Sequence, residues 1–371
     1  MGDTIISTRK PVSVVSFTLM ATALGVSSAA QAQVDDDGGE VVREARPSQS
    51  VENVLREEHA LFSDRLTLEP GINYSYSDRS QLALRGFLAL DAIFLGEINV
   101  DNVQSHITTF DLSTRYGLTD RLELGLNVPF VYRSSTYQSI GQGFSTQLNS
   151  ERSVDDAGLG DISASLSYRL LPETQTRPDV VLNLGVRAPT GTDPYGISTR
   201  TDTIKIDEDD KGNDVNTNLT VPTELPTGNG VWAVTSGVSL LKTLDPAIVF
   251  TNLGYTYNIE ESFDDISASD GKQSGKVDLG DSIRAGFGTA FALNERLSLS
   301  LSYSHEYIQK SETTQGGVTN EVVGSDANVG VFNLGGTYAL NDSTSVVTSL
   351  GLGLTDDASD VSLTFRMPFQ P

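Results

Sequence analysis

Long stretches of this chain alternate between apolar residues and polar or small residues with a period of two. In the stretch 122–133, Leu, Val, Phe and Tyr take the even positions and mainly polar or small residues the odd ones. The same alternation recurs in 66–77, 161–170, 296–307 and 344–355. A period of two places one set of side chains on each face of a β-strand. The pattern therefore predicts an all-β protein whose strands each have one apolar and one polar face.

Strand length and aromatic placement decide between a soluble β-sandwich and a membrane barrel. The alternating stretches run for about 10 to 14 residues, whereas soluble strands average ~5–6 residues and tilted membrane strands need ~9–11. Aromatic residues on the apolar face gather at two levels, as they do at the two interfaces of a membrane. One level holds Tyr74, Tyr76, Phe130, Tyr132, Tyr255, Tyr257, Tyr303 and Tyr307; the other holds Tyr116, Tyr168, Phe291 and Tyr338. Both features predict a transmembrane antiparallel up-and-down β-barrel.

Short turns alternate along the chain with long polar loops. The turn motif 116–122 recurs at 291–297 and 338–344. The long loops are predicted at 134–158, 190–230, 259–276 and 308–326. Short turns at one end and long loops at the other are typical of outer-membrane barrels, whose short turns face the periplasm and whose long loops are extracellular.

The number of strands follows less directly from the sequence than the fold class does. Thirteen clear strands can be read from the alternation, but bacterial single-chain barrels have an even number. Residues 81–101 are therefore predicted to hold two strands, which gives about 14. A barrel of 12 strands with a tucked-in N-terminal segment is the alternative.

The N-terminal part of the chain does not follow this pattern. Residues 1–32 combine Arg9 and Lys10, an apolar stretch and the small-residue site 30–32, which together predict a secretory signal peptide. Residues 33–62 are predicted to be an acidic flexible leader with a short helix after Ser50. Residues 63–371 form the predicted barrel, and the expected location is the cell outer membrane.

Composition narrows the range of functions. The 371 residues carry 25 Lys+Arg and 49 Asp+Glu, a net charge of -24, and no Cys. The negative charge argues against nucleic acid as a partner. The absence of Cys excludes a disulfide scaffold, a thiol nucleophile and Cys-bound zinc. A mean hydropathy of -0.17 excludes a bundle of transmembrane helices but not a barrel.

Catalytic and metal motifs are not evident in the sequence. The three histidines, His59, His106 and His305, show no catalytic arrangement with serine or acidic residues. The loop 207–214 partly resembles a calcium loop, but Lys211 takes a ligand position and no Glu ends it. We therefore expect no enzyme activity, no metal site and no cofactor.

Charged residues on the polar face of the strands are the candidate functional residues. A charge that faced lipid at the middle of the membrane would cost ~2–4 kcal/mol, so these side chains are expected to line the lumen. In one interpretation the arginines form a selective constriction for anionic or aromatic solutes. In the other they pair with acids, Glu69 among them, in a structural network. The candidates are Arg85, Asp111, Arg115, Glu123, Arg133, Asp161, Arg169, Arg187, Arg284 and Glu306.

Several motifs in a fixed order resemble a known family. They are the run 68–76, Arg85-Gly86-Phe87, the run 116–124, Gly158-Leu159-Gly160-Asp161 and Ala188-Pro189-Thr190-Gly191. Together they resemble the outer-membrane transporters of the phenol-degradation MetA-pathway family, which is distantly similar to the outer-membrane channels for long-chain fatty acids and toluene. The resemblance covers most of residues 50–371. It implies passive passage of small, aromatic or hydrophobic solutes, and it does not specify the substrate.

Two alternatives to a channel remain, and the expected partners follow from the location. A structural or surface-interaction barrel with a filled lumen is one alternative, and a barrel hydrolase, which would need a catalytic cluster, is the other. The expected partners are outer-membrane lipid and lipopolysaccharide, a small-molecule solute, and the barrel assembly machinery. That machinery would read the aromatic-ended C-terminal strand 360–369, although Gln370 and Pro371 follow the last aromatic residue.

Overall fold

The structure is a computed structural model that describes most of the chain after residue 65. The described residues are 66–80, 84–89, 92–98, 102–142, 147–208, 214–267 and 271–371. The predicted signal peptide, the leader and His59 lie outside them. Among the described residues, no helix is long and apolar enough to cross a membrane.

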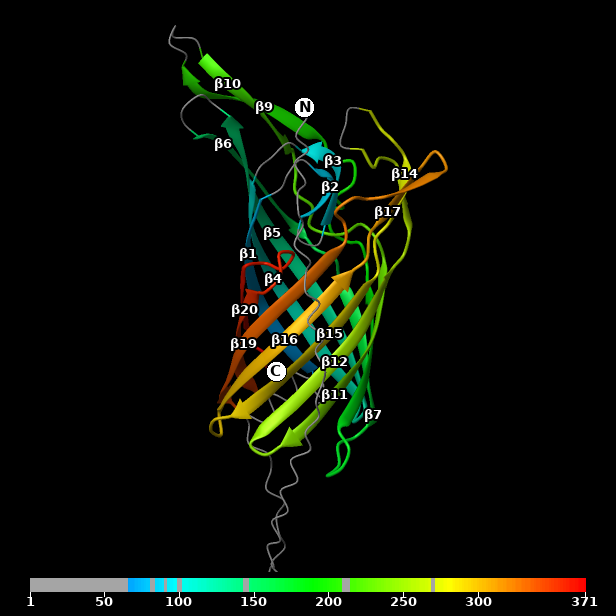
Figure 1. The fold of residues 1–371 in the computed structure, drawn as a ribbon. Helices are drawn as coiled ribbons and strands as arrows, with labels where there is room; N and C mark the ends of the chain where they lie inside the picture. The colour runs from blue at the N-terminus through cyan, green and yellow to red at the C-terminus, as the bar shows by residue number, and fades with distance from the viewer. Residues whose placement is uncertain are drawn as a thin grey trace, which may run out of the picture. The chain divides into compact units, whose positions relative to one another are not determined.

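Twelve antiparallel strands form a closed ring (Figure 1). The ring closes because β1 pairs with β21 on one side and with β4 on the other, and β4 pairs in turn with β5. The fold class predicted from the alternation is therefore confirmed. The twelve strands are β1 (Leu66–Ser80), β4 (Asn102–Thr119), β5 (Leu122–Gln142), β7 (Ser163–Leu171), β8 (Asp179–Arg187), β11 (Ala233–Leu244), β12 (Ala247–Asn258), β15 (Ser282–Ala292), β16 (Leu297–Ile308), β19 (Ala327–Asn341), β20 (Thr344–Gly353) and β21 (Val361–Arg366).

The number of ring strands agrees with the alternative of 12 and not with 14. The larger count required two barrel strands within residues 81–101. These residues instead hold β2 (Leu84–Ala89) and β3 (Ala92–Ile98), which pair with each other in a separate two-stranded sheet. Since β1 pairs directly with β4 along its whole length, no place in the ring remains for them.

An additional strand, β6 (Gln147–Leu159), extends the sheet beyond the ring. The part of β5 from Phe130 onward pairs with β6, whereas the part from Leu122 to Asn127 pairs with β7. The prediction of a loop at 134–158 is therefore wrong for most of its residues. In 139–158 polar residues occupy both parities, so the period of two disappears even though 139–142 belong to β5 and 147–158 to β6.

The other long connections also contain strands. The connection after β8 contains the hairpin of β9 (Thr199–Glu208) and β10 (Asp214–Pro222). Figure 1 shows these strands, with β14 and β17, at the end of the barrel opposite the short turns. A four-stranded sheet joins two further connections and consists of β13 (Glu261–Phe263), β14 (Gly275–Asp278), β17 (Glu312–Gln315) and β18 (Val318–Glu321).

The apolar face of the ring points outward. Leu184, Leu253 and Phe287 are 53%, 54% and 62% exposed, although a water-soluble fold would bury such side chains. Most aromatic residues of both predicted levels are exposed as well, for example Tyr257 at one level and Tyr338 at the other; Tyr76 and Tyr303 are half-buried. A continuous apolar exterior on a closed sheet is the surface that a lipid bilayer requires.

Candidate functional site

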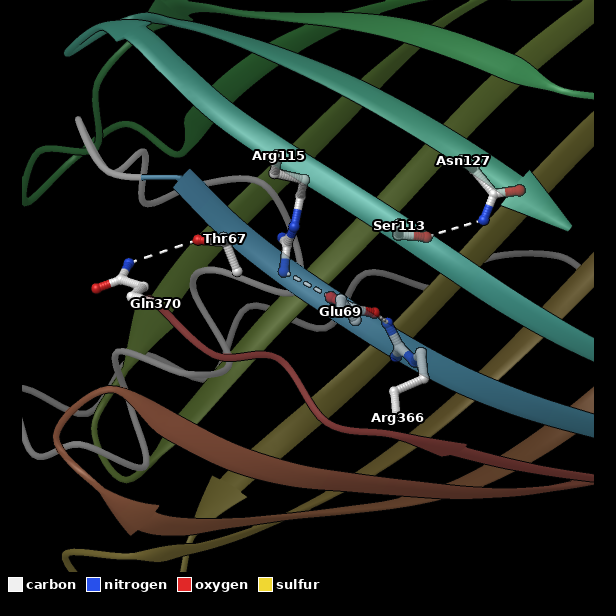
Figure 2. Close-up of polar contacts among 7 residues, drawn as sticks. All are labelled: Thr67, Glu69, Ser113, Arg115, Asn127, Arg366 and Gln370. Carbon is white, nitrogen blue, oxygen red and sulfur yellow. Dashed lines mark hydrogen bonds and ion pairs between the residues drawn. The ribbon is translucent and has the colours of Figure 1, made fainter.

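The interior near the short turns is dominated by an ion cluster around Glu69. This carboxylate is only 5% exposed, because it lies on the inward face of β1 between two arginines of neighbouring strands. The Arg115 Nη2 atom of β4 is 2.9 Å from Oε2, and the Arg366 Nη1 atom of β21 is 2.7 Å from Oε1 (Figure 2). Glu69 thus joins three strands across the seam where the chain's first and last ring strands meet.

Further polar contacts surround this cluster. The Asn127 Nδ2 atom donates to Ser113 Oγ at 2.8 Å, as Figure 2 shows, and lies 3.3 Å from Asp111 Oδ1. Asp111 is therefore held on the same wall as Arg115 by a neutral partner. Gln370 reaches Thr67 at 3.5 Å beside the seam.

A second pair occupies the neighbouring wall at the same end. The Arg169 Nε atom of β7 lies 3.2 Å from Asp179 Oδ2 of β8, and the two side chains are only 16% and 8% exposed. Glu123 on β5 is also buried and has an interaction partner. Just beyond, Lys242 Nζ lies 2.9 Å from Glu173 in the β7–β8 turn. The charges at this end are thus held by nearby partners.

The opposite wall at this end is apolar, which the sequence reading missed. Leu241, Ile248 and Ala290 are nearly fully buried and pack with Phe250 as an internal cluster of β11, β12 and β15. All four lie on the inward parity, where polar residues were expected. A usable signal was present, because the runs Leu240-Leu241 and 248–250 place apolar residues at consecutive positions instead of alternate ones.

Small residues line the middle of the barrel and fit against one another across strands. A Cβ atom added to Gly125 would lie 2.3 Å from Ser165 Oγ, and one added to Gly335 would lie 2.1 Å from Ser300 Oγ. These glycines therefore leave room for the inward hydroxyl groups of the neighbouring strands. The middle level is small and polar, unlike the charged level below it.

A cavity of about 790 Å³ lies inside the barrel toward the long loops. It is bounded by the upper parts of the ring strands and by loop residues such as Tyr195 and Thr227. Apolar groups also contribute to its wall, including Ile107 and Val329. Five of the ten sequence candidates line it, namely Arg133, Asp161, Arg187, Arg284 and Glu306.

Asp161 holds a loop against the cavity wall. Its Oδ1 atom accepts the Gly191 N–H at 3.1 Å, and its Oδ2 atom accepts the Asn229 N–H at 2.8 Å. Gly228 allows this approach, since a Cβ there would lie 2.2 Å from Asp161 Oδ1. Thr227 adds a hydrogen bond from its Oγ1 atom to the Leu159 carbonyl at 2.7 Å. The motifs 158–161 and 188–191 therefore form one backbone junction, which gives both of them a structural role.

The cavity arginines differ in their partners. Arg284 Nη2 lies 2.5 Å from Glu306 Oε2, and Glu306 also accepts a hydrogen bond from Ser282 at 2.7 Å. Arg187 donates to an uncharged group, Asn258 Oδ1, at 3.3 Å. Arg133 is 9% exposed.

Arg85 is the remaining candidate, and it lies outside the ring. It belongs to β2, opposite Glu97 of β3, and its side chain is not among the described ones. The structure thus divides the candidates into a short-turn group and a cavity group. Their function in solute passage stays a prediction.

Two further features concern the chemistry available at the cavity. Burial raises the pKa of the Tyr195 phenol above its ordinary value, so the neutral hydroxyl donates to the Asn229 carbonyl at 3.1 Å. Among the residues that the structure describes, no group of three or more His, Asp or Glu side chains is arranged to hold a metal ion.

The closed ring with an apolar exterior and an inward polar face defines a transmembrane β-barrel of the outer-membrane type. The crystal structure of an outer membrane channel from Pseudomonas putida F1 has this fold: it shares 17% identity with the chain, covers 83% of it and 96% of itself, and has a TM-score of 0.51. The P. putida toluene transporter TodX shares 11% identity, with coverage of 83% and 91% and a TM-score of 0.42. No protein-family model matches the chain.

Proposed function

We propose that this chain is an outer-membrane channel for the passive passage of small hydrophobic or amphipathic solutes. The observation that carries the proposal is the cavity of about 790 Å³ inside a closed ring, lined by both apolar and polar groups. Cavities of this size and lining suit small organic molecules. The likeness of the fold to a solved outer membrane channel supports the same function.

The direct test is solute flux through the purified full-length protein in lipid vesicles. We expect uptake of a small aromatic alcohol to exceed that of protein-free vesicles. Thr235 lines the cavity, so Thr235→Trp should reduce this flux several-fold by filling space. Leu184→Trp is the matched control, because residue 184 faces outward and is 53% exposed. A correctly folded barrel that passes no ion or small solute would contradict the proposal.

The alternative is a structural or surface-interaction barrel with a filled lumen. The ion cluster of Glu69, Arg115 and Arg366 and the apolar cluster opposite it favour this alternative at the short-turn end. The flux experiment separates the two, since a filled lumen passes neither charged nor neutral probes. Catalysis is not part of either proposal.

The proposed partners follow from the membrane location. The outward residues Val361, Leu363 and Phe365 of β21 are exposed to the surroundings of the barrel. They support the proposal that the C-terminal strand carries the signal for barrel assembly. Outer-membrane lipid and lipopolysaccharide are the proposed surroundings of the apolar face, and the predicted signal peptide would supply the export route.

A further inference from the structure

Arg187 differs from most arginines of the barrel interior in having no carboxylate within 4.0 Å among the described residues, although its charge still acts on Glu306 from a greater distance. Its Nη2 atom donates to the Asn258 amide oxygen at 3.3 Å, and its Nε atom is buried with no hydrogen-bond partner in the described part of the chain. Four other interior arginines lie within 4.0 Å of a carboxylate, namely Arg115, Arg169, Arg284 and Arg366. Arg187 is half-buried, and a cation partly removed from water gains from an anion that binds to its free N–H donors.

The acids near Arg187 are already engaged. Both carboxylate oxygens of Asp161 accept loop N–H groups, and Glu306 accepts from Ser282 and Arg284. Four arginines and three acids line the cavity, in a chain whose net charge is -24. The cavity is therefore locally more basic than the molecule around it, and Arg187 keeps donor groups for an anion.

The same cavity offers apolar contacts to the remainder of a ligand. Ile107, Val131, Leu279, Ile308 and Val329 line it together with the hydroxyl groups of Thr235 and Thr256. A bare inorganic anion would gain nothing from this apolar part of the wall. A molecule with an apolar body and one anionic end would gain from both parts.

We propose that Arg187 anchors a binding site for a small amphipathic carboxylate, such as an aromatic acid. The planar guanidinium presents parallel N–H donors that match the two oxygens of a carboxylate. The apolar body of the ligand then lies along the apolar wall of the cavity. This inference rests on the proposed channel function, because it names the class of solute that would pause in the cavity during passage.

The test is equilibrium binding by calorimetry to the full-length protein in detergent, with benzoate, benzyl alcohol and inorganic phosphate as probes. We expect Arg187→Gln to weaken benzoate binding at least about tenfold and to leave benzyl alcohol binding within about twofold. Arg187→Lys should recover only part of the benzoate affinity, because lysine keeps the charge but lacks the parallel N–H donors of the guanidinium.

Arg284→Gln is the matched control, since it removes the same charge from the same cavity but from an arginine that already has a carboxylate partner. We expect it to weaken benzoate binding by less than about threefold. An equal loss in both variants would show a general charge effect and overturn the assignment to Arg187. Phosphate binding as tight as that of benzoate would overturn the amphipathic part of the proposal.

Flux measured in parallel separates this inference from the proposed function. A barrel that passes benzyl alcohol but binds benzoate equally in the parent protein and in Arg187→Gln contradicts the inference alone. A barrel that passes no solute but binds benzoate through Arg187 contradicts the channel function and leaves the carboxylate site in place.

Discussion

The two ends of the barrel interior use charge in opposite ways. Near the short turns, Glu69 binds two arginines and Arg169 faces Asp179, so positive and negative groups compensate each other within the wall. Toward the long loops, the wall surrounds a cavity, and Arg187 hydrogen-bonds to an amide and has no carboxylate within 4.0 Å among the described residues. The comparison teaches that sharing one face of a strand does not give arginines one role. Partner geometry decides whether a charge stabilises the wall or stays available to a ligand.

The largest expected effect comes from removing the acid of the ion cluster. Glu69→Ala leaves Arg115 and Arg366 without their shared carboxylate, and breaking a buried charge pair should lower the free energy of unfolding by about 3 kcal/mol. Urea unfolding in lipid vesicles, followed through the single tryptophan Trp232, measures this change.

The control for this variant is Glu321→Ala on the exposed loop sheet. Glu321 pairs with Lys310 at 3.1 Å, but the two side chains are 62% and 49% exposed. Exposed pairs contribute ~0–1 kcal/mol, so the change should stay below about 1 kcal/mol. Equal losses in the two variants would remove the basis for calling the short-turn end charge-stabilised.

The next effect concerns the loop that bounds the cavity. Gly228→Ala places a Cβ atom 2.2 Å from Asp161 Oδ1 and 2.9 Å from Gly191 Cα, so the junction must shift. We expect a loss of about 2 kcal/mol, as for overpacked sites, and faster proteolysis of the 190–230 loop. Gly254→Ala should change neither, because its nearest contact is the Ser236 carbonyl at 3.8 Å. Unchanged proteolysis of Gly228→Ala would count against the junction.

A smaller effect on the free energy of unfolding is expected at Arg187, which has no carboxylate within ion-pair distance. In Arg187→Gln the nearby Glu306 keeps its direct partners Ser282 and Arg284, and a glutamine can still hydrogen-bond to the Asn258 amide. The unfolding free energy should therefore stay within about 0.5 kcal/mol of the parent value. The same urea titration measures this free energy. A loss above about 1 kcal/mol would show that Arg187 stabilises the barrel wall.

The smallest effect is a local pH dependence in the connection between β13 and β14. The Ser267 and Gln273 backbone N–H groups donate to Asp265 Oδ1 at 3.0 and 3.1 Å and hold the pKa of this carboxyl below its usual value of 3.8. Because the folded pKa is lowered, its contribution is complete above the usual pKa and is lost as pH falls through the folded one.

Hydrogen exchange at Ser267 and Gln273 between about pH 6 and about pH 3 tests this dependence. Protection beyond the intrinsic pH effect should fall in the parent protein and should already be low in Asp265→Ala. Identical protection in the two proteins across this range would exclude Asp265 as the group responsible.

Where a membrane-facing surface existed, the sequence predicted the fold well. The alternation in 122–133 placed Leu124, Leu126 and Phe130 on the outside, and the structure exposes all three. The alternation did not predict β6 or the β9–β10 hairpin, because no consistent apolar face marks these strands. It also failed for residues 81–101, because length and alternation alone do not say whether a strand pairs with its neighbours in the ring or with itself.

For the candidate site, the sequence indicated a face but not a role. Parity placed Arg115, Arg187 and Arg284 on the inward side. The free-energy cost of a charge that faces lipid supported that placement. Parity could not show that Glu69 and Arg366, which are 297 residues apart, are in contact. Nor could it show the apolar cluster of Leu241, Ile248 and Phe250 on a face expected to be polar.

The sequence by itself determined that the chain forms a barrel with one apolar face, because lipid on one side and a wet lumen on the other impose a period of two. Only the tertiary structure decided that the ring has twelve strands and that Asp161 holds a loop. It also decided that Arg187, unlike Arg115, has no carboxylate within ion-pair distance in the described part of the chain. These facts depend on strand register and ring closure, which join residues far apart in the chain at distances of a few ångströms.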